Sequence, residues 1–168
     1  MPKDALHQLD IAPESPGDAA EALALVDRVF GPGRFAKAAE RLREGNHAAP
    51  GLSFVAREGG ILVGSVRLWP VRIGDRTALL LGPIAVDPAA RNRGLGAELV
   101  ARACDAAAAA GHDRLVLVGD PPYFQRLGFE VIPPGKVQLP GPADAGRILV
   151  RGLRPGALEG LEGRVTLP

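Results

Sequence analysis

The segment Arg91-Asn92-Arg93-Gly94-Leu95-Gly96 carries the residue types most suited to binding an anionic ligand. It follows an apolar strand and opens a long predicted helix, whose first N–H groups lack intrahelical acceptors and carry partial positive charge. Glycine has no Cβ, so the main chain at Gly94 and Gly96 can approach a ligand closely. Arg91 and Arg93 add positive charge beside it. The segment therefore predicts a cradle for phosphate groups, with a contact from at least one of the two arginines.

Three kinds of nucleotide site use such a cradle. A P-loop requires Gly-Lys followed by Ser or Thr, which this segment lacks. A dinucleotide site requires a third glycine, where this chain has Leu99, and an acidic residue that ends the next strand, whereas Asp113 precedes it. Coenzyme A is the third ligand, and these residues are compatible with it.

The strand directly before the cradle, Leu79 to Val86, contains a proline that interrupts regular pairing. Pro83 has no N–H to donate, and Gly82 beside it indicates a β-bulge. We expect a gap between this strand and the predicted strand Leu115 to Val118. The pantetheine arm of coenzyme A has two amides and can pair with an exposed strand edge, and a free N–H near the bulge can bind a developing oxyanion. The backbone groups exposed by the gap would be those of Ile84, Ala85 and Val86.

Together these segments resemble the GNAT superfamily of acetyl-CoA-dependent N-acetyltransferases. Arg91 to Gly96 matches the family's phosphate motif, which is Gln or Arg, two residues of any type, Gly, any residue, and Gly or Ala. The preceding Leu-Gly-Pro-Ile-Ala-Val-Asp-Pro resembles the family's cofactor strand. Phe124 to Phe129 resembles its aromatic-x-x-x-Gly-Phe segment. The similarity covers nearly the whole chain and is strongest over residues 52 to 132.

The resemblance implies that an acetyl group passes from acetyl-CoA, as co-substrate, to a primary amine of a small molecule or peptide while both are bound. It also implies an α/β (α+β) fold with a mixed, mostly antiparallel central sheet and helices on both faces, as a single acetyltransferase domain over residues 1–168. A homodimer is one implied assembly, although nothing in the sequence identifies an interface. The implied cofactor-binding residues are Ile84, Ala85, Val86, Arg91, Asn92, Arg93, Gly94, Leu95, Gly96 and Phe124.

One position departs from the family pattern. Many members carry a tyrosine four residues before the glycine of the Gly-Phe pair, where it can protonate the leaving thiolate. Here Phe124 occupies that position and Tyr123 precedes it. Neighbouring residues on a helix point about 100° apart, so Tyr123 is not oriented as the family's tyrosine is. Tyr123 is nevertheless the candidate catalytic acid, and Phe124 is expected to pack against the cofactor. A thiol with a pKa near ~8.5 is already a fair leaving group, so activity does not require this acid.

The amine acceptor is expected between the first two helices and the long central strand. An alkylammonium has a pKa near ~10 and must lose a proton before it attacks, so a base or a water chain is required. Glu40, Glu44 and Glu58 are candidates for that base by location. The alternative function is a catalytically silent module that binds acetyl-CoA or a partner, motivated by Phe124 at the usual acid position. A third possible function is that of a nucleotide-dependent enzyme.

The elements that must position these residues follow from hydrophobic periodicity. Apolar residues at helical spacing predict helices over Ala19 to Phe30 and Arg34 to Glu44, and a third helix after the cradle that ends near Gly111. The three central strands are joined by glycine turns and form an antiparallel meander. Strands are predicted at 8–12, 52–56, 61–73, 77–86, 115–118, 128–132 and 147–153, with a short helix or turn at 121–127 and a surface loop at 133–142.

Composition limits the remaining functions. The chain has 168 residues, 46% of them apolar, and a net charge of +1 with both signs scattered, which argues against a general nucleic-acid binder. No apolar run reaches the roughly 18 residues of a membrane span, and no signal-peptide pattern is present. Cys104 is the only cysteine, so we expect no internal disulfide, no cysteine-based metal site and a cytoplasmic location.

Overall fold

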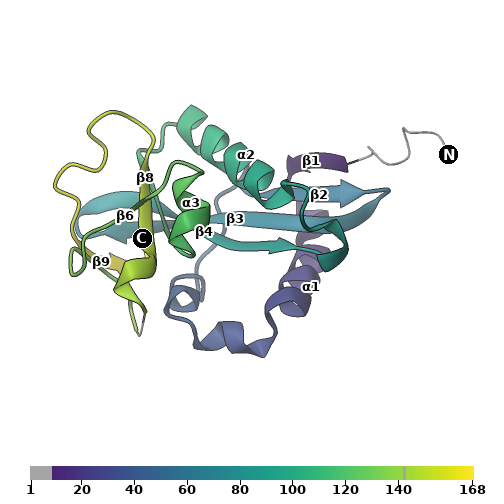
Figure 1. Cartoon of the computed structure of the whole chain (residues 1–168), viewed down its shortest axis with the longest axis horizontal. Coiled ribbons are helices and arrows are strands. Elements are labelled where there is room, and N and C mark those ends of the chain that lie inside the picture. Colours follow the sequence, from purple (N-terminus) through teal and green to yellow (C-terminus); the bar gives the residue numbers. More distant parts are fainter. Residues whose placement is uncertain (1–8, 142) are drawn as a thin grey trace.

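A single nine-stranded sheet organises this computed structural model, which describes residues 9–141 and 143–168 (Figure 1). Its strands are β1 (Leu9–Pro13), β2 (Phe54–Glu58), β3 (Ile61–Ile73), β4 (Arg76–Val86), β5 (Arg114–Val118), β6 (Glu130–Val131), β7 (Val137–Gln138), β8 (Ile148–Gly152) and β9 (Gly163–Thr166). The strand order is β1-β2-β3-β4-β5-β8-β6, and β9 pairs with both β3 and β7. Only β4–β5 and β7–β9 are parallel among these pairs, so the sheet is mixed and mostly antiparallel, as predicted.

Helices cover both faces of the sheet, which confirms the predicted fold class (Figure 1). Helix α2 (Leu95–Ala109) lies on one face, and α1 (Ala19–Phe30) lies on the opposite face with the segment that follows it. A short helix, α3 (Pro121–Gln125), follows β5. Within the described ranges, no helix is long and apolar enough to cross a bilayer. Short 3-10 turns complete the chain: η2 (Pro16–Asp18), η3 (Pro32–Ala36), η4 (Ala38–Leu42), η5 (Pro88–Ala90) and η6 (Ala145–Arg147).

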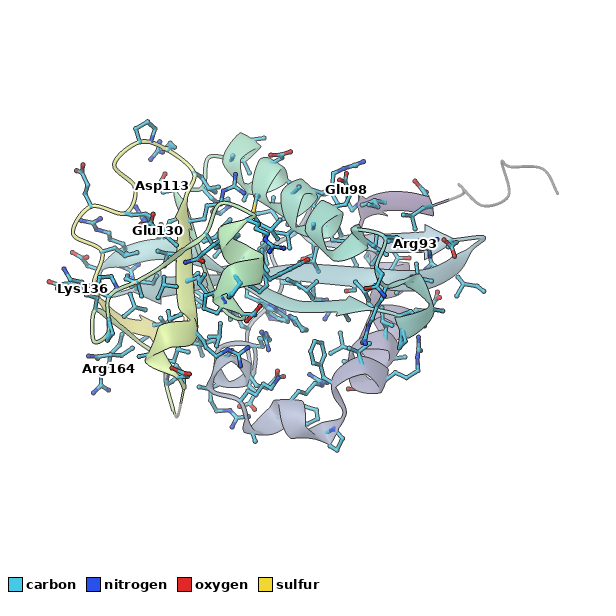
Figure 2. The ribbon with its side chains drawn as sticks, in the orientation of Figure 1. Arg93, Glu98, Asp113, Glu130, Lys136 and Arg164 are labelled. Carbon is cyan, nitrogen blue, oxygen red and sulfur yellow. The ribbon has the colours of Figure 1, made fainter. Side chains whose placement is uncertain are left out.

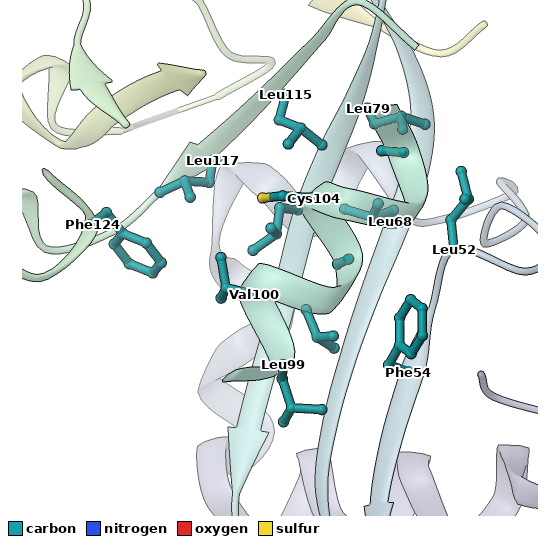
Figure 3. Close-up of a cluster of buried hydrophobic side chains, with 14 of the residues drawn as sticks. Leu52, Phe54, Leu68, Leu79, Leu99, Val100, Cys104, Leu115, Leu117 and Phe124 are labelled. Carbon is teal, nitrogen blue, oxygen red and sulfur yellow. The ribbon is translucent and has the colours of Figure 1, made fainter. Parts of the chain in front are cut away.

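The core between α2 and the sheet is built from one apolar stripe of the helix. Leu99, Val100 and Cys104 of this stripe are buried against Leu68 and the adjacent strands (Figure 3). Burial raises the pKa of the Cys104 thiol, so this cysteine acts as a small core residue and not as a thiolate nucleophile. The strand residues of this core include Leu79, Leu115 and Leu117.

The opposite face carries two further apolar clusters. Leu25 and Val26 of α1 pack against Val55 and Ala85. Leu42, which ends η4, packs with Trp69 and other residues of β3, β4 and β8. The elements on this face are therefore held by burial of apolar surface, which is the main favourable term in folding.

The prediction of a second helix over Arg34 to Glu44 is wrong. Two 3-10 segments, η3 and η4, occupy the region and are separated by Lys37, whose backbone is extended (φ −76°, ψ 142°). The carboxylate of Glu40 accepts from Arg34 Nη1 at 3.2 Å and from Arg43 Nη1 at 3.0 Å. Leu42 of this segment packs with Trp69 of β3, and such tertiary packing can outweigh helix propensity, which is a weak determinant over one short segment.

The C-terminal third contains strands that the sequence pattern did not indicate. Strand β7 lies inside the predicted surface loop 133–142, and β9 was not predicted. Both are short and gain their backbone partners from each other and from Arg72 and Ile73 of β3. Gln8, the first residue of the first predicted strand, lies outside the described ranges, as does Pro142.

Gly64 of β3 allows α2 to approach the sheet closely. A Cβ built there would lie 2.9 Å from Leu99 Cδ1 and 3.2 Å from both Leu95 Cδ2 and Ala56 Cβ. We expect Gly64→Ala to lower the free energy of unfolding by about 1–3 kcal/mol through overpacking. Urea denaturation measures this change. Gly33→Ala is the control, because a Cβ at Gly33 meets nothing within 4 Å. Equal stability of the two variants would contradict the packing argument.

Candidate active site

Strands β4 and β5 separate after a short parallel pairing and form a wedge, the space between residues 81–86 of β4 and 117–118 of β5. Their ladder contains only the pairs Leu79 with Leu115 and Leu80 with Val116. Beyond these positions β4 stays paired with β3 as far as Val86, while β5 stays paired with β8. The predicted gap between the two strands is therefore present.

A bulge in β4 lies at the start of the wedge. Val66 pairs with Ile84 and Leu68 with Leu81, so a single residue of β3 lies opposite Gly82 and Pro83. Gly82 has a φ of 131°, a conformation that a side chain would disfavour. The extra residue that defines a β-bulge is thus in β4, where Pro83 predicted it.

Trp69 of β3 anchors the bulge. Its indole Nε1 donates to the carbonyl oxygen of Gly82 at 2.6 Å, and its side chain is buried in the cluster around Leu42. The sequence analysis did not predict this hydrogen bond, because no short-range pattern links residues 69 and 82. Past the bulge, one edge of β4 is paired with β3 and the other faces the wedge along Ile84, Ala85 and Val86.

The predicted cradle forms the turn from η5 into α2. Asn92 (φ 65°) and Gly94 (φ 73°) are left-handed, and the first intrahelical bond runs from Glu98 N to Gly94 O. No side chain caps this helix at Gly94, so the N–H groups of its first turn are free to bind an anion. Leu95 differs from its neighbours in the turn, because its side chain is buried in the core and only its backbone can face a ligand.

The two arginines of the cradle are placed differently. Arg93 Nη1 donates to Glu58 Oε2 at 2.6 Å, in a surface ion pair that raises the pKa of Arg93 and lowers that of Glu58. In Figure 2, Arg93 extends from the side of the molecule that carries β1 and β2, whereas Glu98 lies on the outer face of α2. Arg91 is exposed, and its Nε donates to Val86 O at 3.3 Å.

Gly96 has no room for a side chain. A Cβ built there would lie 2.9 Å from the Tyr123 hydroxyl and 3.8 Å from Val86 Cγ2. Tyr123 therefore extends over the start of α2 toward the end of β4. Gly82 lies four residues earlier on the strand, about 13 Å away at a rise of ~3.3 Å per residue. The structure thus brings Tyr123 to the cradle, not to the bulge.

Phe124 packs against Gly119, the residue that follows β5. Its ring is buried, forms an edge-on contact with Tyr123 at 4.9 Å between centroids, and contacts Phe129 in the same way at 6.0 Å. A Cβ at Gly119 would lie only 2.3 Å from Phe124 Cε2, so glycine is required at this approach. Tyr123 is about one-third exposed, and burial raises the pKa of its phenol, which keeps the hydroxyl protonated at neutral pH.

A cavity of about 440 Å³ opens between the wedge and the segment that links α1 to β2. Gly82, Pro83 and Phe124 line it from the wedge, and Arg43 lines it from beyond η4. Asp120, at the N-terminus of α3, also lines the cavity, and its side chain does not cap that helix. Arg43 and Asp120 were not singled out from the sequence, because a lone arginine and a lone aspartate carry no local signal.

The three glutamates named as candidate bases lie in different environments. Glu40 is buried and each of its oxygens accepts from an arginine. Glu44 is exposed and bound by Arg41, and Glu58 is bound by Arg93 on the cradle side. None of the three lines the cavity. Among the residues described, no group of three or more His, Cys, Asp and Glu has the arrangement of a metal site.

Comparison with known proteins agrees with this geometry. A sequence model of the acetyltransferase (GNAT) family matches residues 20–129. The chain is 32% identical over 154 residues to the uncharacterized N-acetyltransferase YhbS of Escherichia coli strain K12, covering 90% of this chain and 92% of that protein.

Two solved structures have the same fold over almost their whole lengths. The crystal structure of YhbS from Escherichia coli in complex with CoA superposes with a TM-score of 0.82 at 29% identity, covering 95% of this chain and 89% of that one. A GNAT family acetyltransferase from Brucella melitensis in complex with acetyl-CoA gives 0.72 at 25% identity, covering 96% and 97%. The chain belongs to the GNAT family of acetyltransferases.

Proposed function

We propose that this protein transfers an acetyl group from acetyl-CoA to a primary amine while both substrates are bound. As a GNAT family member it is an acyltransferase with acetyl-CoA as co-substrate, in keeping with the CoA and acetyl-CoA complexes of its structural relatives. The observation that carries the proposal is the wedge, which has an uncapped helix start at one end and a cavity at the other.

The residues present fit a pantetheine–diphosphate ligand. The edge of β4 along Ile84, Ala85 and Val86 has no strand partner on the wedge side, so its backbone can pair with the amides of pantetheine. The turn Arg91 to Gly96 presents helix N–H groups to the diphosphate. A side chain at Gly96 would press against the Tyr123 hydroxyl, so glycine suits this position. Release of Arg93 from Glu58 would add a charged contact.

Bound acetyl-CoA supplies a thioester whose acetyl carbon the amine attacks, forming the C–N bond as the C–S bond breaks. The protein must orient the two substrates, bind the negative charge that develops on oxygen and accept a proton from the amine. We assign charge stabilisation to backbone N–H groups beside the bulge at Gly82, which Trp69 holds in place. We assign proton acceptance to Asp120, whose carboxylate lines the cavity and caps no helix.

Tyr123 and Phe124 have separate roles in this proposal. The sequence made Tyr123 the candidate acid, but its hydroxyl lies beside Gly96 at the diphosphate end of the site. We therefore propose that Tyr123 donates a hydrogen bond to the cofactor near the cradle, and that Phe124 packs against the pantetheine arm. The departing thiolate then takes its proton from water, which its ordinary pKa permits.

The broader setting is also a proposal. We place the protein in the cytoplasm as one acetyltransferase domain of residues 1–168, because a single sheet carries all its described strands and Cys104 is its only cysteine. A homodimer follows from the family resemblance. A small-molecule or peptide amine is the partner, and the net charge of +1 makes a nucleic-acid partner unfavourable.

The second candidate function is a catalytically silent module that binds acetyl-CoA. Phe124 stands where many relatives have an acidic hydroxyl, and Tyr123 does not reach the bulge. Thiol release from acetyl-CoA over a panel of primary amines separates the two functions. Amine-dependent release supports the transferase, whereas tight coenzyme A binding without turnover on any amine supports the module.

Gly96→Val tests the cradle. A branched side chain at this position would collide with the Tyr123 hydroxyl and block the approach of the main chain to the diphosphate. We expect coenzyme A affinity to fall at least about tenfold, because several charge-assisted hydrogen bonds weaken together. Isothermal titration calorimetry measures the loss, with Ala101→Val on the exposed face of α2 as the control. Wild-type affinity in a folded Gly96→Val protein would refute the assignment.

Asp120→Asn tests the proposed base. We expect kcat/KM for the amine to fall about 10²-fold at neutral pH, the lower end for general base catalysis, with coenzyme A affinity unchanged. Steady-state kinetics over a pH range gives this comparison. Glu44→Gln is the matched control, since Glu44 is exposed and does not line the cavity. A larger loss in the Glu44 variant than in the Asp120 variant would assign the base to Glu44.

Tyr123→Phe distinguishes a cofactor contact from an acid role. Loss of one hydrogen bond to a charged group predicts about tenfold weaker coenzyme A binding, while the pH dependence of kcat stays as in the wild type. Calorimetry and pH–rate profiles measure the two effects. A lower kcat with an altered alkaline limb, at unchanged coenzyme A affinity, would instead establish Tyr123 as the catalytic acid.

A further inference from the structure

Four positively charged side chains line the cavity. Arg34, Lys37 and Arg43 contribute from the segment between α1 and β2, and Arg147 contributes from the end of η6. The carboxylates that line the same cavity belong to Asp120 and Asp144. The acceptor end of the site therefore carries more cationic than anionic groups.

Most of the acidic groups near this cluster are already engaged. Glu40 is shared between Arg34 and Arg43, and Arg34 also donates to Asp27 Oδ1 at 2.8 Å. Asp144 accepts from the backbone N–H of Gly146 at 2.9 Å. Among the described residues that line the cavity, Asp120 is the carboxylate that these contacts leave unengaged.

Arg43 has donors that the protein does not use. Its side chain is 13% exposed, and of its guanidinium atoms only Nη1 has a partner among the described residues, Glu40 Oε2 at 3.0 Å. Its Nε is buried without a hydrogen bond, and its Nη2 lies 3.0 Å from the Cβ position of Gly82. Nε and Nη2 form one edge of the planar guanidinium, the edge that binds a carboxylate through two parallel hydrogen bonds. An unused buried donor of this kind calls for a ligand.

Lys37 and Arg147 also keep their charges free for a ligand. The Lys37 ammonium lies 5.3 Å from the centre of the Phe30 ring, and Arg147 Nε donates to the Gly119 carbonyl at 3.1 Å. Neither is joined to a carboxylate in the described part of the chain. Burial lowers the pKa of Arg43 despite the contact with Glu40, which is consistent with incomplete compensation of its charge.

We propose that the acceptor is a primary amine that also bears a carboxylate, which Arg43 binds beside the bulge with support from Lys37. The inference rests on the proposed acetyl transfer and names the class of its second substrate. Arg43 approaches Gly82 from the cavity side, so a carboxylate bound there would place the rest of a short amino acid against the wedge. Glu40 is a positioning residue, because it holds Nη1 and directs the free edge of Arg43.

An alternative role for Arg43 would be direct stabilisation of the reacting oxygen near Gly82. The two roles predict different patterns. A recognition residue affects only acceptors that carry the anionic group, whereas a residue that acts on the reacting oxygen affects all amines equally.

The test uses the full-length protein and a series of ω-amino acids, glycine, β-alanine, 4-aminobutanoate and 6-aminohexanoate, each matched with an alkylamine of similar length. We expect kcat/KM to favour the carboxylate member of at least one pair by about tenfold or more. O-Phosphoethanolamine is included to distinguish a phosphate from a carboxylate, and a phosphate preference would overturn the carboxylate assignment. Arg43→Met should remove the preference while changing turnover of the alkylamine less than about threefold.

Three further variants keep the result interpretable. Arg41→Met alters a neighbouring exposed arginine that binds Glu44 and does not line the cavity, so it should retain the preference. Lys37→Met provides an independent variant if Arg43→Met does not fold, and it should reduce the same preference. Arg43→Lys should restore part of the preference, since it returns the charge without the planar edge.

A binding measurement separates this inference from the proposed function. Calorimetry with the acetylated probe 4-acetamidobutanoate, against N-propylacetamide as the uncharged probe, should show tighter binding of the carboxylate that is lost in Arg43→Met. Amine turnover without a carboxylate preference, or equal losses for both members of each pair, would overturn the inference and leave acetyl transfer intact. Absence of coenzyme A binding would overturn the proposed function, and the calorimetric comparison would still decide whether this cluster binds a carboxylate.

Discussion

The separation of β4 from β5 is the constraint on which the rest of the site depends. Each strand is committed to a different neighbour over its full length, β4 to β3 and β5 to β8. Between them only two residue pairs join before the strands diverge. The bulge at Gly82 and Pro83 bends β4, and the hydrogen bond from Trp69 holds that bend in a buried environment. A ligand with backbone-like amides can therefore enter where a regular sheet would leave no unpaired edge.

The two ends of this wedge are built from different groups. One end meets the uncapped start of α2, where aligned N–H groups favour a phosphate. The other meets a cavity surrounded by arginine and lysine side chains, with Asp120 as the carboxylate left without a capping role. Phe124 packs between them on Gly119 and supplies an apolar wall. In the proposed function, this arrangement separates binding of the cofactor from binding of the acceptor along one strand.

Charge compensation around Glu40 links the local fold to the proposed acceptor. Burial of a carboxylate requires partners, and Arg34 and Arg43 provide one hydrogen bond to each oxygen. The two contacts are made within the segment that forms η3 and η4, where the sequence predicted one helix. They leave Nε of Arg43, a residue that lines the cavity, without a hydrogen bond. A single buried glutamate thus joins the two turns and holds the arginine that we propose binds the acceptor.

Sequence alone determined the features that depend on local chemistry. Pro83 lacks a donor, so a bulge and a gap could be predicted at its position, and the glycines of Arg91 to Gly96 marked the uncapped helix start beside the wedge. The hydrophobic periods placed the central strands and α2 correctly. Tertiary structure decided the contacts between residues distant in the chain, such as Trp69 with Gly82, Arg43 with the cavity and Tyr123 with Gly96. Each of these depends on how separate elements pack together, and no pattern of short period encodes a contact that forms only after the sheet has assembled.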